Sequence, residues 1–185
     1  MLVSLAFHSI LKPRQRVYPV IEFPLLLMFP AAMAFAGAMD LFTMTIPNRV
    51  SLALIAAFAV VVAMTGAPLS VVINHIGAGI VFLGVGIFMF SMRWLGGGDA
   101  KLLAAAALWL GFDSVFPYLV LVTVLGGLLA VGLLSFRSIA PPVWMMRQEW
   151  ALRLHDPQGG IPYGIALAGA ALWVYPSTPW FLAFA

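Results

Sequence analysis

Six apolar stretches separated by short polar breaks dominate this chain of 185 residues. A membrane-spanning helix needs about 20 apolar residues, within a range of about 17–25. Five stretches reach that length, and the short fourth one must also cross if the charged loops are to stay on one side. The stretches cover residues 20–39, 50–66, 71–92, 100–112, 115–136 and 162–184. The sequence therefore predicts an all-α polytopic membrane protein, a bundle of about six transmembrane helices forming one domain at 20–185.

The composition supports this class and excludes several others. Charged residues make up 8% of the chain, 64% is hydrophobic, and the mean hydropathy is +1.09. A soluble domain carries about 25% charged residues, so this chain cannot cover a water-facing surface and lipid must replace it. The net charge of +3 is too small and scattered for nucleic-acid binding. The absence of cysteine excludes disulfides, thiolate zinc sites and a cysteine nucleophile.

Lys and Arg residues are distributed unevenly between the expected loops. The loops after the second and fourth helices hold none, and the positive-inside rule therefore places the other loops in the cytoplasm. Those other loops, after the first, third and fifth helices, contain Arg49, Arg93, Lys101, Arg137, Arg147 and Arg153. Basic residues before the first helix oppose this orientation, but the three loops agree with one another.

Two segments are expected at the membrane surface. Residues 1–11 are apolar and lack the leading positive charges of a signal peptide, and we expect residues 1–19 to form an interfacial or disordered leader. The loop at 137–160 alternates bulky apolar side chains with charged ones, a mixture typical of a helix lying in the interface. The residues concerned are Val143, Trp144, Trp150 and Leu152, with Arg147, Glu149 and Arg153.

Two of the six acidic residues are expected to meet. Asp40 closes the first helix, the chain then crosses twice, and Asp99 follows at the same membrane face. Asp113 lies one crossing further on, at the opposite face. A carboxylate in or beside a span is costly and is by default a functional candidate. The order of crossings thus selects Asp40 and Asp99 as a pair.

A pair of adjacent carboxyl groups has a defined chemical use. Like charges disfavour joint ionisation, so the pair shares one proton, and the ionised member can activate a water while the protonated one polarises a carbonyl. This is aspartic protease chemistry, which needs no metal or other cofactor. Gly96, Gly97 and Gly98 before Asp99 permit a flexible turn, and Lys101 could stabilise negative charge nearby.

Other polar positions have structural as well as functional interpretations. Asn48 after Pro47 is well placed to cap the second helix with its side chain, which is a commoner role than catalysis. Pro162 and Gly164 are expected to shape the start of the last helix. His75 is interpreted as a polar packing group, because no second ligand is placed to share a metal.

The motifs around both Asp residues are similar to those of a known family. Gly96-Gly97-Gly98-Asp99 matches a GxGD motif, and the segments from Asp40 to Ile46-Pro47-Asn48 and Pro162-Tyr163-Gly164 follow the pattern of the type IV prepilin peptidases. The resemblance implies a membrane aspartic protease with Asp40 and Asp99 as catalytic residues, in the bacterial inner membrane with its site at the cytoplasmic face. Its partners would be a prepilin or pilin-like precursor and the lipid bilayer. The chain resembles the compact kind found with Flp pili, and we expect peptidase activity without N-methylation.

Two other classes of function remain open. In a small ion- or proton-coupled transporter, Asp40, Asp99 and Lys101 would be relay groups, but such a protein predicts polar residues at mid-membrane and often repeated halves. A non-catalytic subunit of a secretion system would keep the fold without needing the Asp pair. Replacement of either Asp by Asn distinguishes this non-catalytic subunit from the protease.

Overall fold

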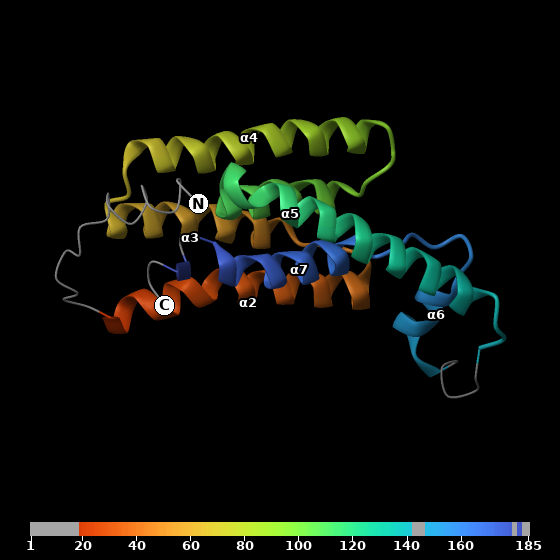
Figure 1. The fold of residues 1–185 in the computed structure, drawn as a ribbon. Helices are drawn as coiled ribbons and strands as arrows, with labels where there is room; N and C mark the ends of the chain where they lie inside the picture. The colour runs from red at the N-terminus through yellow and green to blue at the C-terminus, as the bar shows by residue number, and fades with distance from the viewer. Residues whose placement is uncertain (1–18, 142–146, 179–180, 183–185) are drawn as a thin grey trace.

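The computed structural model describes residues 19–141, 147–178 and 181–182, and its regular elements there are all helical. The elements are α2 (Pro19–Thr43), α3 (Asn48–Thr65), α4 (Leu69–Ser91), α5 (Gly97–Arg137), α6 (Glu149–His155), α7 (Tyr163–Val174) and the 3₁₀ turn η2 (Tyr175–Ser177). The all-α prediction is confirmed. By length and composition, α3, α4 and α5 can each cross a membrane. Figure 1 shows the long helices side by side along one common direction.

The element α5 consists of two helices joined at Gly111. The backbone of Gly111 is not helical, with φ 66° and ψ 173°. In Figure 1 the chain reverses its direction here, so that 97–110 returns alongside α4 and 112–137 runs back again. The antiparallel pairing with α4 is close, because a Cβ added at Gly86 would lie 3.0 Å from the Ala100 carbonyl oxygen. The predicted break between the fourth and fifth helices is therefore confirmed.

Side chains of α4 hold the reversal in place. The backbone N–H of Phe112 donates to Asn74 Oδ1 at 2.9 Å, which satisfies a donor at the start of the returning helix. A Cβ at Gly111 would lie 2.7 Å from the same oxygen and 3.0 Å from the His75 ring. The ring nitrogen Nδ1 of His75 lies 2.9 Å from the Leu108 carbonyl oxygen. Glycine is required at position 111, and His75 packs at the turn as the sequence predicted.

An aromatic cluster fills the bundle near this reversal. The Trp109 ring stacks on Phe29 at 5.3 Å between centroids, meets Phe58 at 5.9 Å and Tyr175 at 6.3 Å. Its indole N–H donates to the Leu54 carbonyl oxygen at 2.9 Å. Each aromatic pair contributes about 0.5–1.5 kcal/mol beyond the area that it buries. The cluster joins α2, α3, α5 and η2 at what we call the Gly111 end of the bundle.

The opposite end, which we call the α6 end, holds the loops that matter for the site. The helices α2 and α4 end there, and α3, α5 and α7 begin there (Figure 1). Arg137 fixes the chain beyond α5, because its Nε donates to the Leu154 carbonyl oxygen and its Nη2 to that of Gly160, both at 2.8 Å. The Trp150 ring of α6 meets Phe42 of α2 at 5.4 Å. A short helix thus exists within the loop predicted to be interfacial, and Val143 and Trp144 lie outside the described residues.

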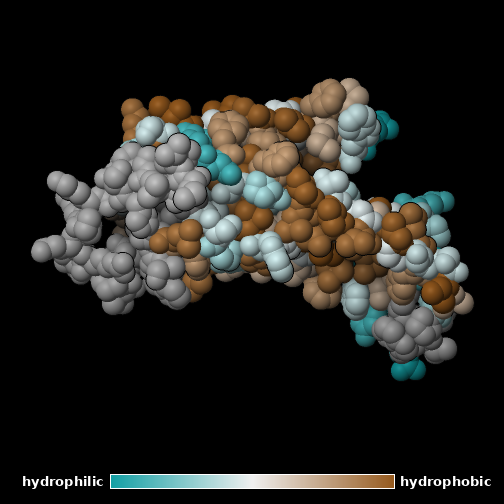
Figure 2. All heavy atoms as spheres, viewed as in Figure 1, coloured by the Kyte–Doolittle hydropathy of each residue, from teal (hydrophilic) through white to brown (hydrophobic). Residues whose placement is uncertain are grey.

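The outer surface of the bundle is apolar. Large side chains such as Ile80 and Leu128, each 65% exposed, face outward. Figure 2 shows apolar residues over α4 and α5, with hydrophilic residues gathered mainly toward the ends. Such surface is rare on soluble monomers, whereas lipid is the natural solvent for it. The chain is a membrane protein.

Two predicted boundaries change. The first helix continues to Thr43, beyond the apolar stretch predicted at 20–39, and Asp40 lies in its last turn. The last apolar stretch, predicted as one helix over 162–184, is interrupted: α7 ends at Val174, and a 3₁₀ turn containing Pro176 follows. Proline lacks the N–H that an α-helix needs and restricts the residue before it, which explains the early end. The leader predicted for 1–19 lies outside the described residues up to residue 18.

Candidate active site

Asp40 is buried in the last turn of α2 and is held by the start of α7. Its side chain is 5% exposed, and its Oδ2 accepts a hydrogen bond from the Gly164 backbone N–H at 2.7 Å. The first N–H groups of a helix have no partner inside that helix. Because Pro162 starts α7 and Gly164 follows within its first turn, an unused N–H points at the Asp40 carboxylate. The proline–glycine motif therefore positions an acid that is 124 residues away in the sequence.

This contact requires that α2 and α7 approach closely. A Cβ at Gly164 would lie 2.8 Å from Asp40 Oδ2 and 2.9 Å from Asp40 Cβ. One turn earlier on α2, a Cβ at Gly37 would lie 2.9 Å from Ala168 Cβ. Small residues allow helices to pack this closely within a bilayer. Gly164 thus supplies both the donor and the space for the carboxylate.

Asp99 lies in the first turn of α5, after the three glycines. Its side chain is 9% exposed. A Cβ added at Gly96 would lie 2.9 Å from Asp99 Oδ2, so the carboxylate turns back toward the residue that precedes the helix. The other oxygen, Oδ1, is buried and has no hydrogen-bond partner within the described chain. A buried polar atom without a partner is uncommon, and it leaves one oxygen of Asp99 available to a substrate or a water.

Ile46 lies between the two acidic segments. A Cβ at Gly98, next to Asp99, would lie 3.0 Å from Ile46 Cβ. A Cβ at Gly164, next to Asp40, would lie 2.8 Å from Ile46 Cδ1. The carboxyl groups of Asp40 and Asp99 interact electrostatically. The structure therefore brings together the two acids that the order of crossings pairs, and Gly98 has no side chain because Ile46 occupies that space.

Tyr118 is a polar neighbour of Asp99 that the sequence reasoning did not identify. It is fully buried, and its hydroxyl has no hydrogen-bond partner within the described residues. It interacts electrostatically with Asp99. Buried tyrosine hydroxyls usually find a partner. The sequence offered one signal, a tyrosine inside an otherwise apolar stretch, one turn after Ser114. That signal does not indicate which residue the tyrosine faces.

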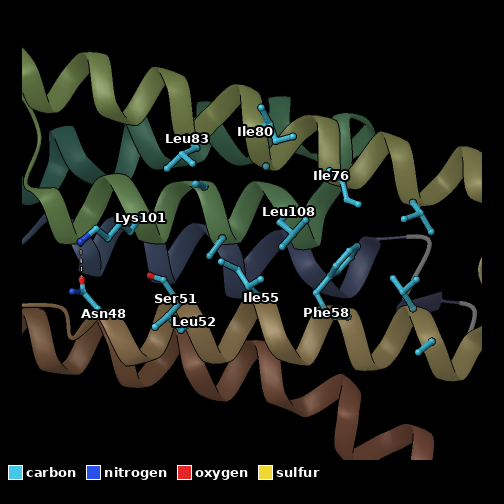
Figure 3. A pocket seen from close by; sticks show the side chains of 17 residues that line it. Asn48, Ser51, Leu52, Ile55, Phe58, Ile76, Ile80, Leu83, Lys101 and Leu108 are labelled. Atoms are coloured by element: carbon cyan, nitrogen blue, oxygen red, sulfur yellow. Dashed lines mark hydrogen bonds between the residues drawn. The ribbon is translucent and has the colours of Figure 1, made fainter.

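Lys101 and Asn48 form a hydrogen bond with each other, and Pro47 lies at the N-terminal cap of α3. The exposed Lys101 Nζ donates to Asn48 Oδ1 at 2.8 Å (Figure 3). The prediction that the Asn48 side chain caps α3 is wrong, since Pro47 holds the cap position and no side chain donates or accepts there. The competing partner is the lysine ammonium, a charged donor that binds the amide oxygen more strongly than a backbone N–H does.

Asp113 lies at the Gly111 end, far from the pair. Its Oδ2 accepts a hydrogen bond from Asn74 Nδ2 at 3.5 Å. The helical segment 97–110 of α5 lies between Asp113 and the end of the bundle that holds Asp99. Over the part of the chain that the structure describes, no group of three or more His, Cys, Asp or Glu side chains is arranged to hold a metal ion.

The geometry supports one type of chemistry above others. Two buried carboxyl groups share a site at helix ends, one fixed by a backbone N–H and one with an unpartnered oxygen. Such a pair can take a proton from a water and give a proton to a carbonyl oxygen or leaving group. The pair lies near the end of α2 and the beginnings of α5 and α7, at the α6 end of the bundle.

Comparisons with known proteins place the chain among leader peptidases. The model of a family described as the type IV leader peptidase family matches residues 27–131, a range that contains both acids. Two curated proteins of Burkholderia pseudomallei, from strains 1026b and K96243, are each called prepilin leader peptidase/N-methyltransferase. Each is 32% identical to the chain over 158 residues, which is 82% of the chain and 46% of the relative. The chain thus spans about half the length of these relatives. No solved structure matches it.

Proposed function

Because this chain belongs to the type IV leader peptidase family, we propose that it is an aspartic endopeptidase that removes the short leader from type IV prepilins or pilin-like precursors. Asp40 and Asp99 are its catalytic pair. The observation that carries this proposal is the meeting of two buried carboxyl groups from α2 and α5, which interact across the Ile46 segment. Precursors of the Flp type are the proposed substrates.

The reaction uses one water held between the carboxyl groups. The ionised carboxylate takes a proton from this water as its oxygen attacks the amide carbon, and the protonated member gives its proton to the carbonyl oxygen. When the tetrahedral intermediate collapses, the C–N bond breaks and the leaving nitrogen receives a proton. One oxygen of Asp40 is occupied by the hydrogen bond from the Gly164 N–H. Asp99 Oδ1 has no such bond and can contact the water or the carbonyl.

The glycine turn and the apolar bundle position the substrate. Gly96, Gly97 and Gly98 carry no side chains that would obstruct an extended peptide approaching Asp99. An apolar segment of the precursor embedded in the membrane holds the adjacent cleavage site over the pair, which lowers the entropic barrier. Arg49, Arg93 and Arg137 belong to the loops and helix ends of the α6 end, which supports a site at the cytoplasmic face of the bacterial inner membrane.

The test is co-expression with candidate precursors, scored by the loss of mass on cleavage. Asp40→Asn and Asp99→Asn should each lower cleavage by at least about 10²-fold, the usual contribution of a general acid or base. The matched control is Asp113→Asn, which removes an acid of α5 at the Gly111 end of the bundle. This variant should cleave the precursor like wild type. All three variants should reach the membrane in equal amounts. Cleavage by the Asp40 or Asp99 variant at the wild-type rate would refute the proposal and favour a non-catalytic role.

A further inference from the structure

Ile46 belongs to a sequence motif that the reaction described above does not use. It is buried, and it contacts both acidic segments at once. A Cβ added at Gly98 would lie 3.0 Å from Ile46 Cβ and 3.4 Å from the Ile46 backbone N and O atoms. A Cβ added at Gly164 would lie 2.8 Å from Ile46 Cδ1 and equally close to Asp40 Oδ2. The tip of the isoleucine therefore packs beside Asp40, and its base packs on the residue before Asp99.

A braced turn at the end of α2 presents Ile46 to this space. Met44 adopts the left-handed conformation, with φ 53°, and its N–H donates to the Asp40 carbonyl oxygen at 2.9 Å. Glycine is usual at such a helix end, and a residue with a side chain persists there only where the surrounding structure fixes it. The hydroxyl groups of Thr43 and Thr45 bind one another at 2.8 Å across this turn. The backbone between Asp40 and Ile46 is thus held in one conformation.

A second contact, two residues beyond Ile46, holds the same helix start. Asn48 Oδ1 accepts the hydrogen bond from Lys101 Nζ at 2.8 Å, and the proline between Ile46 and Asn48 has a φ of −63° that its ring fixes. Gly98 and Lys101 lie in the first turns of α5, on either side of Asp99 in the sequence. The segment that follows α2 therefore meets the start of α5 at two points, and Asp99 lies between them in the sequence.

The chemistry of the two acids depends on how far apart they are and on what lies between them. Two like charges interact more strongly when they are close and surrounded by apolar groups than when water separates them. Ile46 places an aliphatic side chain here, which cannot form a hydrogen bond with either acid. Because isoleucine is branched at Cβ, it populates few rotamers and keeps a fixed shape.

We propose that Ile46 is a positioning residue, an apolar spacer of fixed shape that sets the separation of the Asp40 and Asp99 carboxyl groups and limits the water between them. The inference rests on the proposed function, since it concerns the same pair. Ile46 acts through the two acids, so its loss should affect the chemical step more than the binding of the precursor.

The first experiment measures kcat and KM for precursor cleavage by the full chain. Ile46→Ala keeps the Cβ that rests on Gly98 and removes the atoms beside Asp40. It should lower kcat by about 10- to 100-fold with KM little changed, because a misplacement of about 1 Å costs up to about 10²-fold. Ile46→Val, which removes only Cδ1, should lose less.

The control for these variants is Val61→Ala, which truncates a buried residue near the other end of α3. It should lower the melting temperature without lowering kcat, since it leaves the two acids in place. If Ile46→Ala keeps the same kcat as Val61→Ala, the proposal is overturned.

The second experiment compares two side chains of nearly the same shape. Ile46→Thr differs from Ile46→Val by a hydroxyl group, which can bind a carboxyl group or a water. We expect Ile46→Thr to cleave more slowly and to narrow the pH range over which kcat/KM is high. The reason is that a hydroxyl and water weaken the interaction between the acids and bring their two ionisation steps closer together. Tyr118, which interacts with Asp99, and Lys101 are unchanged in both variants.

Identical rates and pH profiles for the Thr and Val variants would refute the role of Ile46 as a spacer. The Asp40→Asn and Asp99→Asn variants separate this inference from the proposed function. If they lose cleavage while the Ile46 variants keep the wild-type kcat and pH profile, the spacer fails and the protease function stands. If they cleave at the wild-type rate, both proposals fail.

Discussion

The contact between Gly164 and Asp40 yields a sharp test of how the site is held. In Gly164→Ala, the new methyl group would lie 2.8 Å from both Asp40 Oδ2 and Ile46 Cδ1, which is closer than real Cβ atoms come to other atoms. Rotation of the Asp40 side chain does not relieve the contact, because Asp40 Cβ is also only 2.9 Å from the new methyl group. The carboxylate must move, and its hydrogen bond of 2.7 Å to the Gly164 N–H is lost or lengthened.

The expected magnitude follows from that hydrogen bond. A hydrogen bond to a charged group contributes about 1.5–3 kcal/mol. If the displaced carboxylate must be returned to its place for each reaction, kcat/KM falls by about 10- to 150-fold, since about 1.4 kcal/mol corresponds to tenfold in rate. Overpacking of the α2–α7 contact adds about 1–3 kcal/mol of destabilisation. Both effects are measurable in detergent-solubilised protein, by precursor cleavage and by the melting temperature.

Two further variants separate the effect on Asp40 from strain. Gly169→Ala lies on the same helix, where the added methyl group meets only Leu125 Cδ1 at 3.4 Å, and it should behave like wild type. Gly37→Ala strains the same helix pair against Ala168, at 2.9 Å, without touching the carboxylate. It should lower the melting temperature but lower cleavage far less than Gly164→Ala. Equal losses of cleavage in the Gly37 and Gly164 variants would refute the positioning role of Gly164.

Three other predictions concern the turn, the buried hydroxyl and the cofactor requirement. Gly111→Ala should destabilise the protein by about 3 kcal/mol or more, because the backbone there suits only glycine and the methyl group meets Asn74 Oδ1 at 2.7 Å. The control Gly127→Ala, with free space around the added methyl group, should not lower the melting temperature. Tyr118→Phe removes only a buried hydroxyl. It should lower kcat/KM by up to about tenfold and shift the pH profile of kcat/KM, without lowering stability. An unchanged pH profile would show that Tyr118 does not influence Asp99. Cleavage should persist in the presence of EDTA, and a loss that one specific metal restores would contradict the metal-free scheme.

The order of crossings was enough to predict which acids meet. Each apolar stretch of sufficient length changes the side of the membrane, so the parity of the crossings between Asp40 and Asp99 places both at one end, and Asp113 at the other. The break at Gly111 was also visible, because a short apolar stretch ended in a glycine and polar residues. The end of α3 followed the same logic, with Gly66 in the left-handed conformation and its N–H bonded to the Val62 carbonyl oxygen.

The contacts around the acids could not be predicted in this way. Counting crossings gives the end of the bundle at which a residue lies, but not the rotation of its helix. The rotation of α2 against α7 depends on small residues such as Gly37 fitting against Ala168, which is a property of the packed pair. For the same reason the sequence assigned Asn48 to the cap of its own helix, whereas Lys101 from a helix 53 residues away binds it. Tertiary contacts overrode the local preference in each case.

The role of α7 follows from an electrostatic mismatch in α2. Asp40 sits in the last turn of that helix, where the exposed carbonyl groups carry partial negative charge and disfavour a carboxylate, whereas Asp99 sits in a first turn, where partial positive charge favours one. Asp40 is therefore the member that cannot be held by its own helix. The N-terminus of α7 supplies the missing positive end, through the Gly164 N–H. Helix α7 is thus part of the site as well as a member of the bundle, and changes at Pro162 or Gly164 should disturb Asp40 before they disturb Asp99.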